Sequence, residues 1–164
     1  MTVTIREAAS DELDALIPVL LLAEPSLRAL RWSLRNMTDA AYRLDVDGEL
    51  TAAATMRWTG DPCEIVELGV VAERQGHGYG RRFVEWLFGE AHRRGRKEMI
   101  VGTSSTSAAN LLFYQKCGFR IDSIRHDYFW YYDEPHVENG LPVRDMIVFR
   151  RAISAPTRDA RQTR

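Results

Sequence analysis

The sequence has few cysteines and no long hydrophobic run. Its 164 residues include two cysteines, Cys63 and Cys117, which are too few for a disulfide framework and lack the spacing of a metal site. We therefore expect a reduced, cytoplasmic protein without a bound metal. The longest apolar run, residues 16–23, is interrupted by Pro18, whereas a membrane-spanning helix needs ~20 apolar residues. The N-terminus also lacks the basic and apolar regions of a secretory signal, so neither membrane insertion nor export is predicted.

An excess of charge of either sign is also missing. The chain contains 22 Lys and Arg against 23 Asp and Glu, a net charge of −1, which argues against nucleic acid or an anionic membrane as a partner. The four histidines lack the paired spacing of metal ligands. Hydrophobic residues make up 45% of the chain, as in an average globular protein. We expect one domain over residues 1–153 and a flexible polar tail over residues 154–164.

Strand-like and helix-like hydrophobic patterns follow one another along the chain. Seven segments have the alternation or apolar content of β-strands: residues 2–7, 42–46, 50–58, 63–71, 99–102, 119–129 and 143–151. Helical periodicity marks four others: residues 13–21, 27–34, about 83–94 and 108–116. Asp47-Gly48, between two alternating runs, is a strong hairpin signal. The order predicts an α/β fold with a mixed, mostly antiparallel sheet of about seven strands flanked by helices.

A glycine cluster between the fourth strand and the next helix is the most informative segment. It reads Gln75-Gly76-His77-Gly78-Tyr79-Gly80 and is flanked by Arg74, Arg81 and Arg82. Glycines let backbone N–H groups approach an anion closely, and the helix N-terminus adds the positive end of a dipole. The segment predicts a cradle for phosphate or pyrophosphate. The plainer alternative is a flexible loop whose glycines only allow tight packing.

The spacing of this glycine loop fits neither of two common nucleotide-binding motifs. A P-loop ends in Gly-Lys-Ser/Thr, whereas two arginines follow Gly80. A dinucleotide-binding fingerprint has its third glycine one residue later, and it needs an acidic residue for the ribose that is missing here.

The glycine loop instead resembles the Gln-x-x-Gly-x-Gly signature of the GNAT N-acetyltransferase superfamily. Gln75, Gly78 and Gly80 stand in the signature positions, and Gly76 is an additional glycine. Residues 110–119, Asn-Leu-Leu-Phe-Tyr-Gln-Lys-Cys-Gly-Phe, resemble the helix and stop that follow the family's fifth strand. The order of elements over nearly the whole chain is similar to the GNAT fold as well.

This resemblance implies acetyl-CoA as donor, a primary amine as acceptor and direct attack of the amine on the thioester, without an acyl-enzyme. By the family pattern, backbone N–H groups of the glycine loop hold the pyrophosphate. The end of the preceding strand pairs with the pantetheine arm, and one of its N–H groups polarises the thioester carbonyl. The expected CoA-binding residues are Leu68, Gly69, Val70, Val71, Gln75, Gly76, His77, Gly78, Tyr79, Gly80, Arg81 and Asn110. A Gly80→Asp substitution is expected to cause a severe loss of CoA binding while the fold is retained.

Tyr114 is the candidate general acid. It stands four residues after Asn110, so the two share one face of the predicted helix. The departing thiolate, with a free-thiol pKa of ~8.5, needs a proton that a phenol can supply. The resemblance assigns that role to Tyr114 and places Asn110 in a hydrogen bond to the pantetheine or to nearby backbone. The alternative for Tyr114 is a half-buried packing role.

Glu64 and Glu67 are the candidate general bases, because an amine must lose a proton before it attacks. Glu64 lies 11 residues before Gln75 (75 − 64), where several family members carry the base, so it is preferred over Glu67. Their odd separation puts them on opposite faces of a regular strand, unless a bulge intervenes. A water chain as base, and ordinary exposed glutamates, remain the alternatives.

The connection before the last strand combines acidic and aromatic residues. Five consecutive aromatics, residues 128–132, stand among Asp127, Asp133, Glu134 and Glu138. In the family this connection often borders the acceptor cleft. We therefore expect a small cationic amine as acceptor, drawn to carboxylates such as Asp133 and Glu134 and to aromatic faces. A solvated acidic loop is the alternative.

Two functions are compatible with these patterns. One is an acetyl-CoA-dependent N-acetyltransferase, and the other is a non-catalytic acyl-CoA-binding or sensor module with the same fold. Family members often dimerise through late strands, which makes a homodimer a candidate assembly.

Overall fold

A tight hairpin forms at the Asp47-Gly48 signal. It joins β2 (Ala40–Val46) to β3 (Glu49–Arg57), which pair antiparallel. Asp47 and Gly48 have φ values of 51° and 86°, in the left-handed region that a two-residue turn of this kind requires. The predicted hairpin is confirmed.

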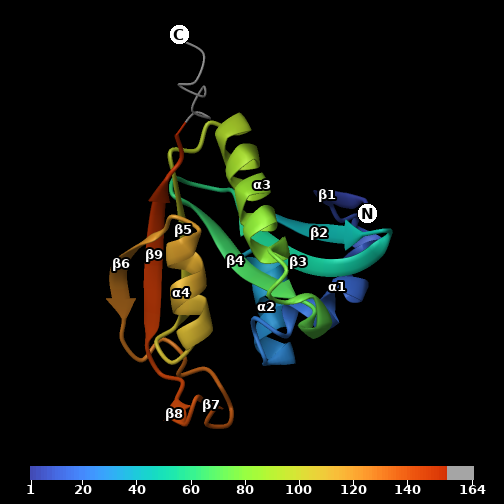
Figure 1. Ribbon diagram of the computed structural model, residues 1–164. Helices are drawn as coiled ribbons and strands as arrows, with labels where there is room; N and C mark the ends of the chain where they lie inside the picture. Colours follow the sequence, from blue (N-terminus) through green and yellow to red (C-terminus); the bar gives the residue numbers. More distant parts are fainter. Residues whose placement is uncertain (155–164) are drawn as a thin grey trace.

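This hairpin belongs to a seven-stranded sheet in the computed structural model, which describes residues 1–154 (Figure 1). The strand order is β1-β2-β3-β4-β5-β9-β6, and every neighbouring pair is antiparallel except β4 and β5. The other strands are β1 (Val3–Glu7), β4 (Cys63–Val70), β5 (Glu98–Ser104), β6 (Arg120–Arg125) and β9 (Met146–Ala152). The prediction of an α/β fold with a mixed, mostly antiparallel sheet is confirmed.

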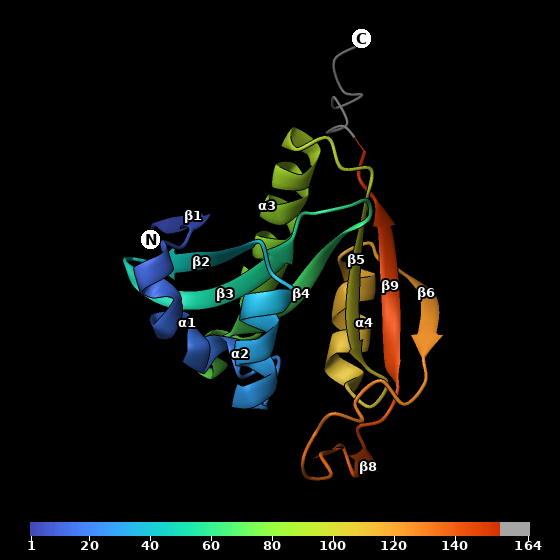
Figure 2. The ribbon, with the colours of Figure 1, turned by 180° about the vertical axis from the view of Figure 1, so that it is seen from behind.

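Helices cover both faces of the sheet (Figures 1 and 2). Along β3, Ala52 and Ala54 belong to the core beneath α3 and α4, whereas Ala53 between them belongs to the core beneath α1 and α2. This alternation is the period of two that a strand imposes on its side chains. The helices are α1 (Leu13–Leu20), α2 (Leu27–Asn36), α3 (Tyr79–Arg93) and α4 (Ala108–Lys116), with short 3₁₀ helices η1 (Ser10–Glu12) and η2 (Ala72–Arg74).

The sheet opens in its middle, between β4 and β5. These strands pair only over Cys63–Ile65 and Met99–Val101, and beyond that point they separate (Figure 2). A bulge lies at the same place, because Thr55 of β3 faces Glu67 while the next residue, Met56, faces Ile65. Val66 is therefore an extra residue in β4. The edge of β4 that faces β5 carries no partner strand from this bulge onward.

The last third of the chain departs from the predicted strands. β6 ends at Arg125, not at residue 129, because Asp127 adopts a left-handed φ of 53° and pairs with Arg144 through a 2.5 Å contact. The final strand correspondingly starts at Met146 rather than at residue 143.

A second small hairpin was missed in the long connection. Strands β7 (Val137–Glu138) and β8 (Leu141–Pro142) flank Asn139 and Gly140, which have φ values of 52° and 76°. Asn-Gly is as strong a hairpin signal as Asp-Gly, so the sequence did contain the information.

Three further expectations concern the C-terminal tail, membrane-spanning helices and bound metal. The predicted tail, apart from Ser154, lies outside the described residues. Within residues 1–154, none of the helices has the length and apolar character needed to cross a membrane. The same part of the chain contains no group of three or more His, Cys, Asp or Glu arranged to hold a metal ion.

Candidate active site

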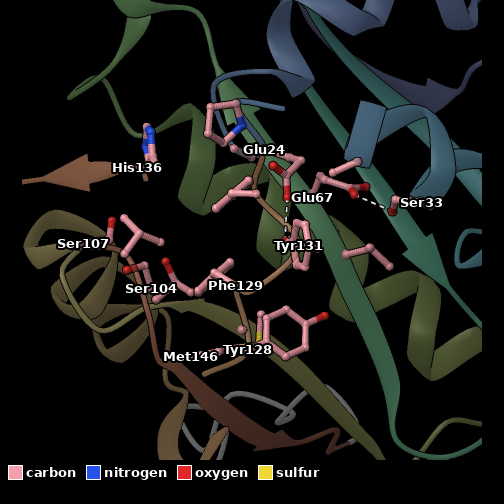
Figure 3. A pocket seen from close by; sticks show the side chains of 18 of the residues that line it. Glu24, Ser33, Glu67, Ser104, Ser107, Tyr128, Phe129, Tyr131, His136 and Met146 are labelled. Atoms are coloured by element: carbon pink, nitrogen blue, oxygen red, sulfur yellow. Dashed lines mark hydrogen bonds between the residues drawn. The ribbon is translucent and has the colours of Figure 1, made fainter. Parts of the chain in front are cut away.

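A cavity of about 930 Å³ lies where β4 and β5 diverge. Four parts of the chain line it: the connection between α1 and α2 together with α2, β4, the segment from β5 to α4, and the connection between β6 and β9 with the start of β9. Figure 3 shows part of this lining. The size is that of sites for small-molecule ligands, which range over ~300–1,000 Å³.

Glu64 and Glu67 both line this cavity, with 8% and 6% of their surface exposed. The bulge at Val66 adds one residue between them, which is why their odd separation does not send them to opposite faces. The alternative of two ordinary exposed glutamates is therefore wrong. Both of the predicted base candidates reach the same buried space.

The two carboxylates are held in different ways. Glu64 forms an ion pair with Arg57, its neighbour across the sheet on β3. Glu67 accepts a 2.6 Å hydrogen bond from the hydroxyl of Ser33 on α2 and another from the hydroxyl of Thr55 on β3. Within the described residues, Glu67 forms no salt bridge.

Burial raises the pKa of both carboxyl groups above the ordinary glutamate value. For Glu64 the charge of Arg57 opposes this effect, and for Glu67 the hydrogen bonds from Ser33 and Thr55 oppose it. The negative charges of Glu24 and Glu64 add to the upward shift of the Glu67 pKa. Glu67 is thus a buried carboxylate near like charges and without a cationic partner, a setting that favours proton uptake.

Tyr114 of α4 also lines the cavity and has 6% of its surface exposed. Its ring packs against Phe119 and Phe149, with centroids 5.8 Å away in both cases. Among the described residues, no group forms a hydrogen bond with its hydroxyl. Burial raises the pKa of this phenol, so it stays protonated and can donate to a ligand.

Asn110 lies one turn before Tyr114 and lines the same cavity. The predicted common face of the two side chains is therefore confirmed. The Asn110 amide donates a 3.3 Å hydrogen bond to the hydroxyl of Thr103 on β5. This contact holds the amide where β5 leaves β4.

The open edge of β4 presents backbone groups from alternate residues. The Val71 N–H donates to Thr51 O on β3 at 2.9 Å. Because N–H direction alternates along a strand, the Leu68 and Val70 groups point to the opposite, unpaired edge. The side chain of Gln75 donates to Val70 O at 3.0 Å, which agrees with that direction.

Gly69 has a packing role that the sequence did not reveal. A Cβ at this position would overlap the carbonyl oxygen of Val19. The glycine therefore lets α1 lie directly against β4.

The glycine loop lies beyond the end of β4 and outside the cavity lining. Gly76 and Gly78 have φ values of 76° and 84°, and a Cβ at either would meet nothing within 4 Å. Gly78 is the residue immediately before α3. The exposed backbone at the start of this 15-residue helix has the character of an anion cradle.

Gly80 differs from these two glycines. A Cβ there would lie 3.1 Å from the Phe113 ring of α4 and 3.5 Å from Val70 Cγ2. Since Gly80 lets α3 approach α4 and β4, Gly80→Asp would push a carboxylate into that packing. The expectation that this substitution leaves the fold intact has no support in the structure.

Other predicted loop residues contribute through backbone or remain exposed. The Tyr79 side chain is buried, and its hydroxyl donates to the sulfur of Met1 at 3.5 Å. The His77 ring nitrogen lies 2.9 Å from the Gln75 carbonyl oxygen. The Arg81 side chain is exposed in the first turn of α3.

The acidic connection contributes aromatic rings to the cavity but fewer carboxylates than expected. All five aromatics, residues 128–132, line it. Asp133 instead forms a 2.8 Å ion pair with Arg28, and neither Asp133 nor Glu134 is part of the lining. The expectation that these two carboxylates face the acceptor is wrong. Asp133 serves to tie the connection to α2.

Three functional candidates come from residues that the sequence did not single out. Ser33 and Thr55 hold Glu67, as described above. Glu24 lines the cavity and accepts a 3.0 Å hydrogen bond from the hydroxyl of Tyr131 (Figure 3). No local pattern marks these residues, because tertiary packing alone brings α2 and the α1–α2 connection to β4.

Comparisons with known proteins agree with this architecture. The sequence model described as an acetyltransferase (GNAT) domain matches residues 39–121, slightly more than half of the chain. The protein named as the uncharacterized N-acetyltransferase YvbK of Bacillus subtilis (strain 168) is 34% identical over 143 residues, covering 86% of this chain and 91% of the relative.

Two solved structures share the fold over nearly the whole chain. A Bacillus subtilis acetyltransferase in complex with CoA is 31% identical with a TM-score of 0.82, and the match covers 93% of this chain and 100% of that one. A GNAT family acetyltransferase from Elizabethkingia anophelis with acetyl-CoA bound is 28% identical with a TM-score of 0.82, and the match covers 92% of this chain and 97% of that one. The resemblance noted in the glycine loop is thereby confirmed, and the chain belongs to the GNAT family of N-acetyltransferases.

Proposed function

We propose that the protein transfers the acetyl group of acetyl-CoA to a primary amine, which attacks the thioester directly inside the cavity between β4 and β5. One observation carries this proposal. A buried carboxylate without a cationic partner, Glu67, and a buried phenol without a hydrogen-bond partner, Tyr114, line one cavity at the unpaired edge of β4. Glu67 provides a proton acceptor and Tyr114 a proton donor, beside a β4 backbone whose N–H groups can bind a carbonyl oxygen.

The residues present fit CoA as the acyl carrier. The open edge of β4 offers the backbone groups of Leu68 and Val70 to an extended pantetheine arm, as an added strand would use them. The exposed glycine loop at the start of α3 suits the pyrophosphate. Two structural relatives whose structures contain CoA or acetyl-CoA support CoA as the carrier.

In this proposal, Glu67 accepts the proton that the acceptor ammonium must lose. We favour Glu67 over Glu64, because the Arg57 charge stabilises the ionised form of Glu64 and weakens its affinity for a proton. The amine nitrogen then bonds to the acetyl carbon, and the N–H of Leu68 or Val70 stabilises the charge on its oxygen. The carbon–sulfur bond breaks as Tyr114 supplies a proton to the departing sulfur, and the proton that the new amide nitrogen loses restores the Tyr114 phenol.

Burial makes the proton transfer to sulfur reasonable, although it also raises the Tyr114 pKa. The cost of placing a negative charge in the dry site applies to the leaving thiolate as well as to the phenolate. Within this chain, burial raises the pKa of the Cys63 thiol to about 11. A thiolate released beside Tyr114 is therefore a stronger base than a thiolate in water, and it draws the phenol proton more readily.

The acceptor is proposed to be a small cationic amine. Glu24, Glu67 and Glu138 all line the cavity, and none of them forms a salt bridge among residues 1–154. The rings of the 128–132 segment offer faces that attract cations and apolar groups. An amine in its ammonium form can interact favourably with both the carboxylates and the aromatic rings.

Release of CoA tests the proposed function. Purified protein, acetyl-CoA and a panel of primary amines should yield free thiol and the acetylated amine in equal amounts, detected by a thiol reagent and by mass spectrometry. A protein that binds acetyl-CoA by calorimetry and releases no thiol with any amine would instead be the non-catalytic acyl-CoA-binding module.

The glycine loop is tested by Gly78→Asp. A carboxylate at this exposed position would face the phosphates, and we expect the Kd for CoA to rise ~10-fold or more, the effect of about 1.4 kcal/mol of repulsion. The matched control is Gly48→Asp in the β2–β3 turn. Gly48 has a φ of 86°, close to the 84° of Gly78, and both sites are open, so the backbone strain is the same. Equal CoA affinity in the two folded variants would show that the loop does not hold the pyrophosphate.

A further inference from the structure

We propose that the acceptor carries a second positive charge, which binds at Glu24, so that the enzyme acts preferentially on diamines. This inference rests on the proposed function and specifies its acceptor. It places the reacting amine near Glu67 and Tyr114, and the far end of the same molecule against the carboxylate of Glu24 and the rings of Tyr131 and Tyr132.

The Glu24 carboxylate is fixed in the cavity wall. It belongs to the connection between α1 and α2 and is half-buried. One oxygen accepts a 3.0 Å hydrogen bond from the Tyr131 hydroxyl, and the other accepts a 3.1 Å hydrogen bond from the Ser26 N–H. Glu24 also acts on the hydroxyl of Tyr132, whose pKa it helps to raise. The carboxylate is therefore oriented between two tyrosines before any ligand arrives.

No cation of the described chain neutralises Glu24. Arg28 of α2 also lines the cavity, but its guanidinium donates to Asp133 at 2.8 Å and to the carbonyl oxygen of Tyr131 at 3.1 Å. These contacts tie the 128–132 segment to α2, and Arg28 pairs with Asp133 rather than with Glu24. The favourable partner for a fixed carboxylate between aromatic rings is a cation, held by charge and by the ring faces together.

Glu24 and Glu67 act on each other through the same space. The charge of Glu24 raises the pKa of Glu67, and Figure 3 shows the two side chains near each other in the cavity wall. A ligand with one ammonium group would neutralise only one of two neighbouring carboxylates. A ligand with two ammonium groups would neutralise both, and the cavity of about 930 Å³ has room for such a chain or ring.

The reacting end is identified separately, by Tyr114. Its hydroxyl belongs to a side chain that is only 6% exposed, lines the cavity and has no hydrogen-bond partner in the described part of the chain. Because this hydroxyl makes no hydrogen bond within the described chain, it is free to donate one to a ligand atom in the cavity. Glu24 lies on the α1–α2 connection and Tyr114 on α4, and both line the cavity, so one bound molecule can contact both.

A matched series of acceptors tests this inference. Hexylamine, hexamethylenediamine and aminocaproate share a chain length and differ at the far end, which is methyl, ammonium or carboxylate; shorter and longer homologues extend the series. With acetyl-CoA, kcat/KM is expected to be ~10-fold or more higher for the diamine than for the monoamine at the best length, and lowest for the amino acid. Added salt should reduce the diamine advantage.

The Glu24→Gln variant tests whether Glu24 causes the preference for diamines. The amide keeps the acceptor oxygen and removes the charge, so the ratio of kcat/KM between diamine and monoamine should fall to within ~2-fold. Glu134→Gln is the matched control, because this exposed carboxylate lies outside the cavity lining, and it should keep the full ratio. Thermal unfolding establishes that both variants are folded. The acceptor series on the unmodified protein tests the second-charge site independently of the variants.

The outcomes separate this inference from the proposed function. Equal kcat/KM for monoamine and diamine at every length would overturn the second-charge site while acetyl transfer stands. A diamine preference that survives Glu24→Gln would overturn the assignment to Glu24. Absence of CoA release with every amine would overturn the proposed function, and this inference with it.

Discussion

Replacement of Tyr114 by phenylalanine is expected to lower kcat by ~10²-fold or more while CoA binds as before. The substitution removes one hydroxyl and keeps the ring that packs against Phe119 and Phe149. That hydroxyl has no hydrogen-bond partner among residues 1–154, so its loss breaks no contact within the described chain. The thiolate would then leave the buried site without a proton donor. Steady-state kinetics with an accepted amine, and calorimetry with CoA, measure the two effects.

Tyr79→Phe is the control for loss of a buried tyrosine hydroxyl. The Tyr79 hydroxyl contacts the sulfur of Met1, and its residue does not line the cavity. We expect kcat to change by less than ~2-fold in this variant. If Tyr114→Phe also retained kcat within that margin, the proton would come from water or from another group.

The parts of the fold that the sequence predicted are those determined by local chemistry. Asp47-Gly48 forms the hairpin between β2 and β3 because both residues tolerate a positive φ. Glycines after a strand mark the start of α3, and the apolar side of α3 packs where its periodicity put it. The end of β6 was misjudged, because Asp127 turns the chain at a position where the apolar and aromatic pattern continues.

The geometry of the active site depends on contacts between distant segments. Both glutamates were identified as candidates, but their common direction depends on the bulge at Val66, which the β3–β4 register creates. The preference for Glu64 rested on a position relative to the glycine loop, and it took no account of Arg57, which lies opposite Glu64 on β3. Cross-strand partners cannot be read from one strand alone.

The carboxylates of the cavity also depend on contacts between distant segments, which the sequence does not reveal. Counting carboxylates in the late connection pointed to Asp133, yet Asp133 lies outside the cavity lining and pairs with Arg28 of α2. Glu24, a carboxylate of the lining that contacts this connection, is 107 residues from its partner Tyr131. Aromatic content predicted the wall correctly, because large rings are buried wherever space is available.

Replacement of Glu67 by glutamine is expected to lower kcat/KM by ~10²–10⁴-fold, the usual contribution of a general base. An amide cannot accept the ammonium proton, although it can keep hydrogen bonds with Ser33 and Thr55. Burial raises the Glu67 pKa above its ordinary value near 4.5, so the fall of kcat/KM toward low pH should be centred above that value in the unmodified enzyme. Glu67→Gln should lose this part of the pH profile.

Glu64→Gln is the matched comparison, because it makes the same chemical change in the same cavity. We expect a smaller loss and a retained fall of kcat/KM at low pH, since the charge of Arg57 opposes the upward shift of the Glu64 pKa and weakens Glu64 as a base. A larger loss in Glu64→Gln than in Glu67→Gln, with the pH profile altered only in the former, would assign the base to Glu64.

Stability should change in the opposite direction from activity in Glu67→Gln. Because the folded-state pKa of Glu67 lies above the unfolded value, the folded chain binds more protons between the two values. The free energy of unfolding therefore falls as pH rises through that window, starting near 4.5, and the loss persists at higher pH. Glutamine carries no such penalty, so the melting temperature of Glu67→Gln relative to the unmodified protein should rise as the pH increases above about 4.5. A relative melting temperature that does not change with pH would contradict the raised pKa, and with it the reason for choosing Glu67 as the base.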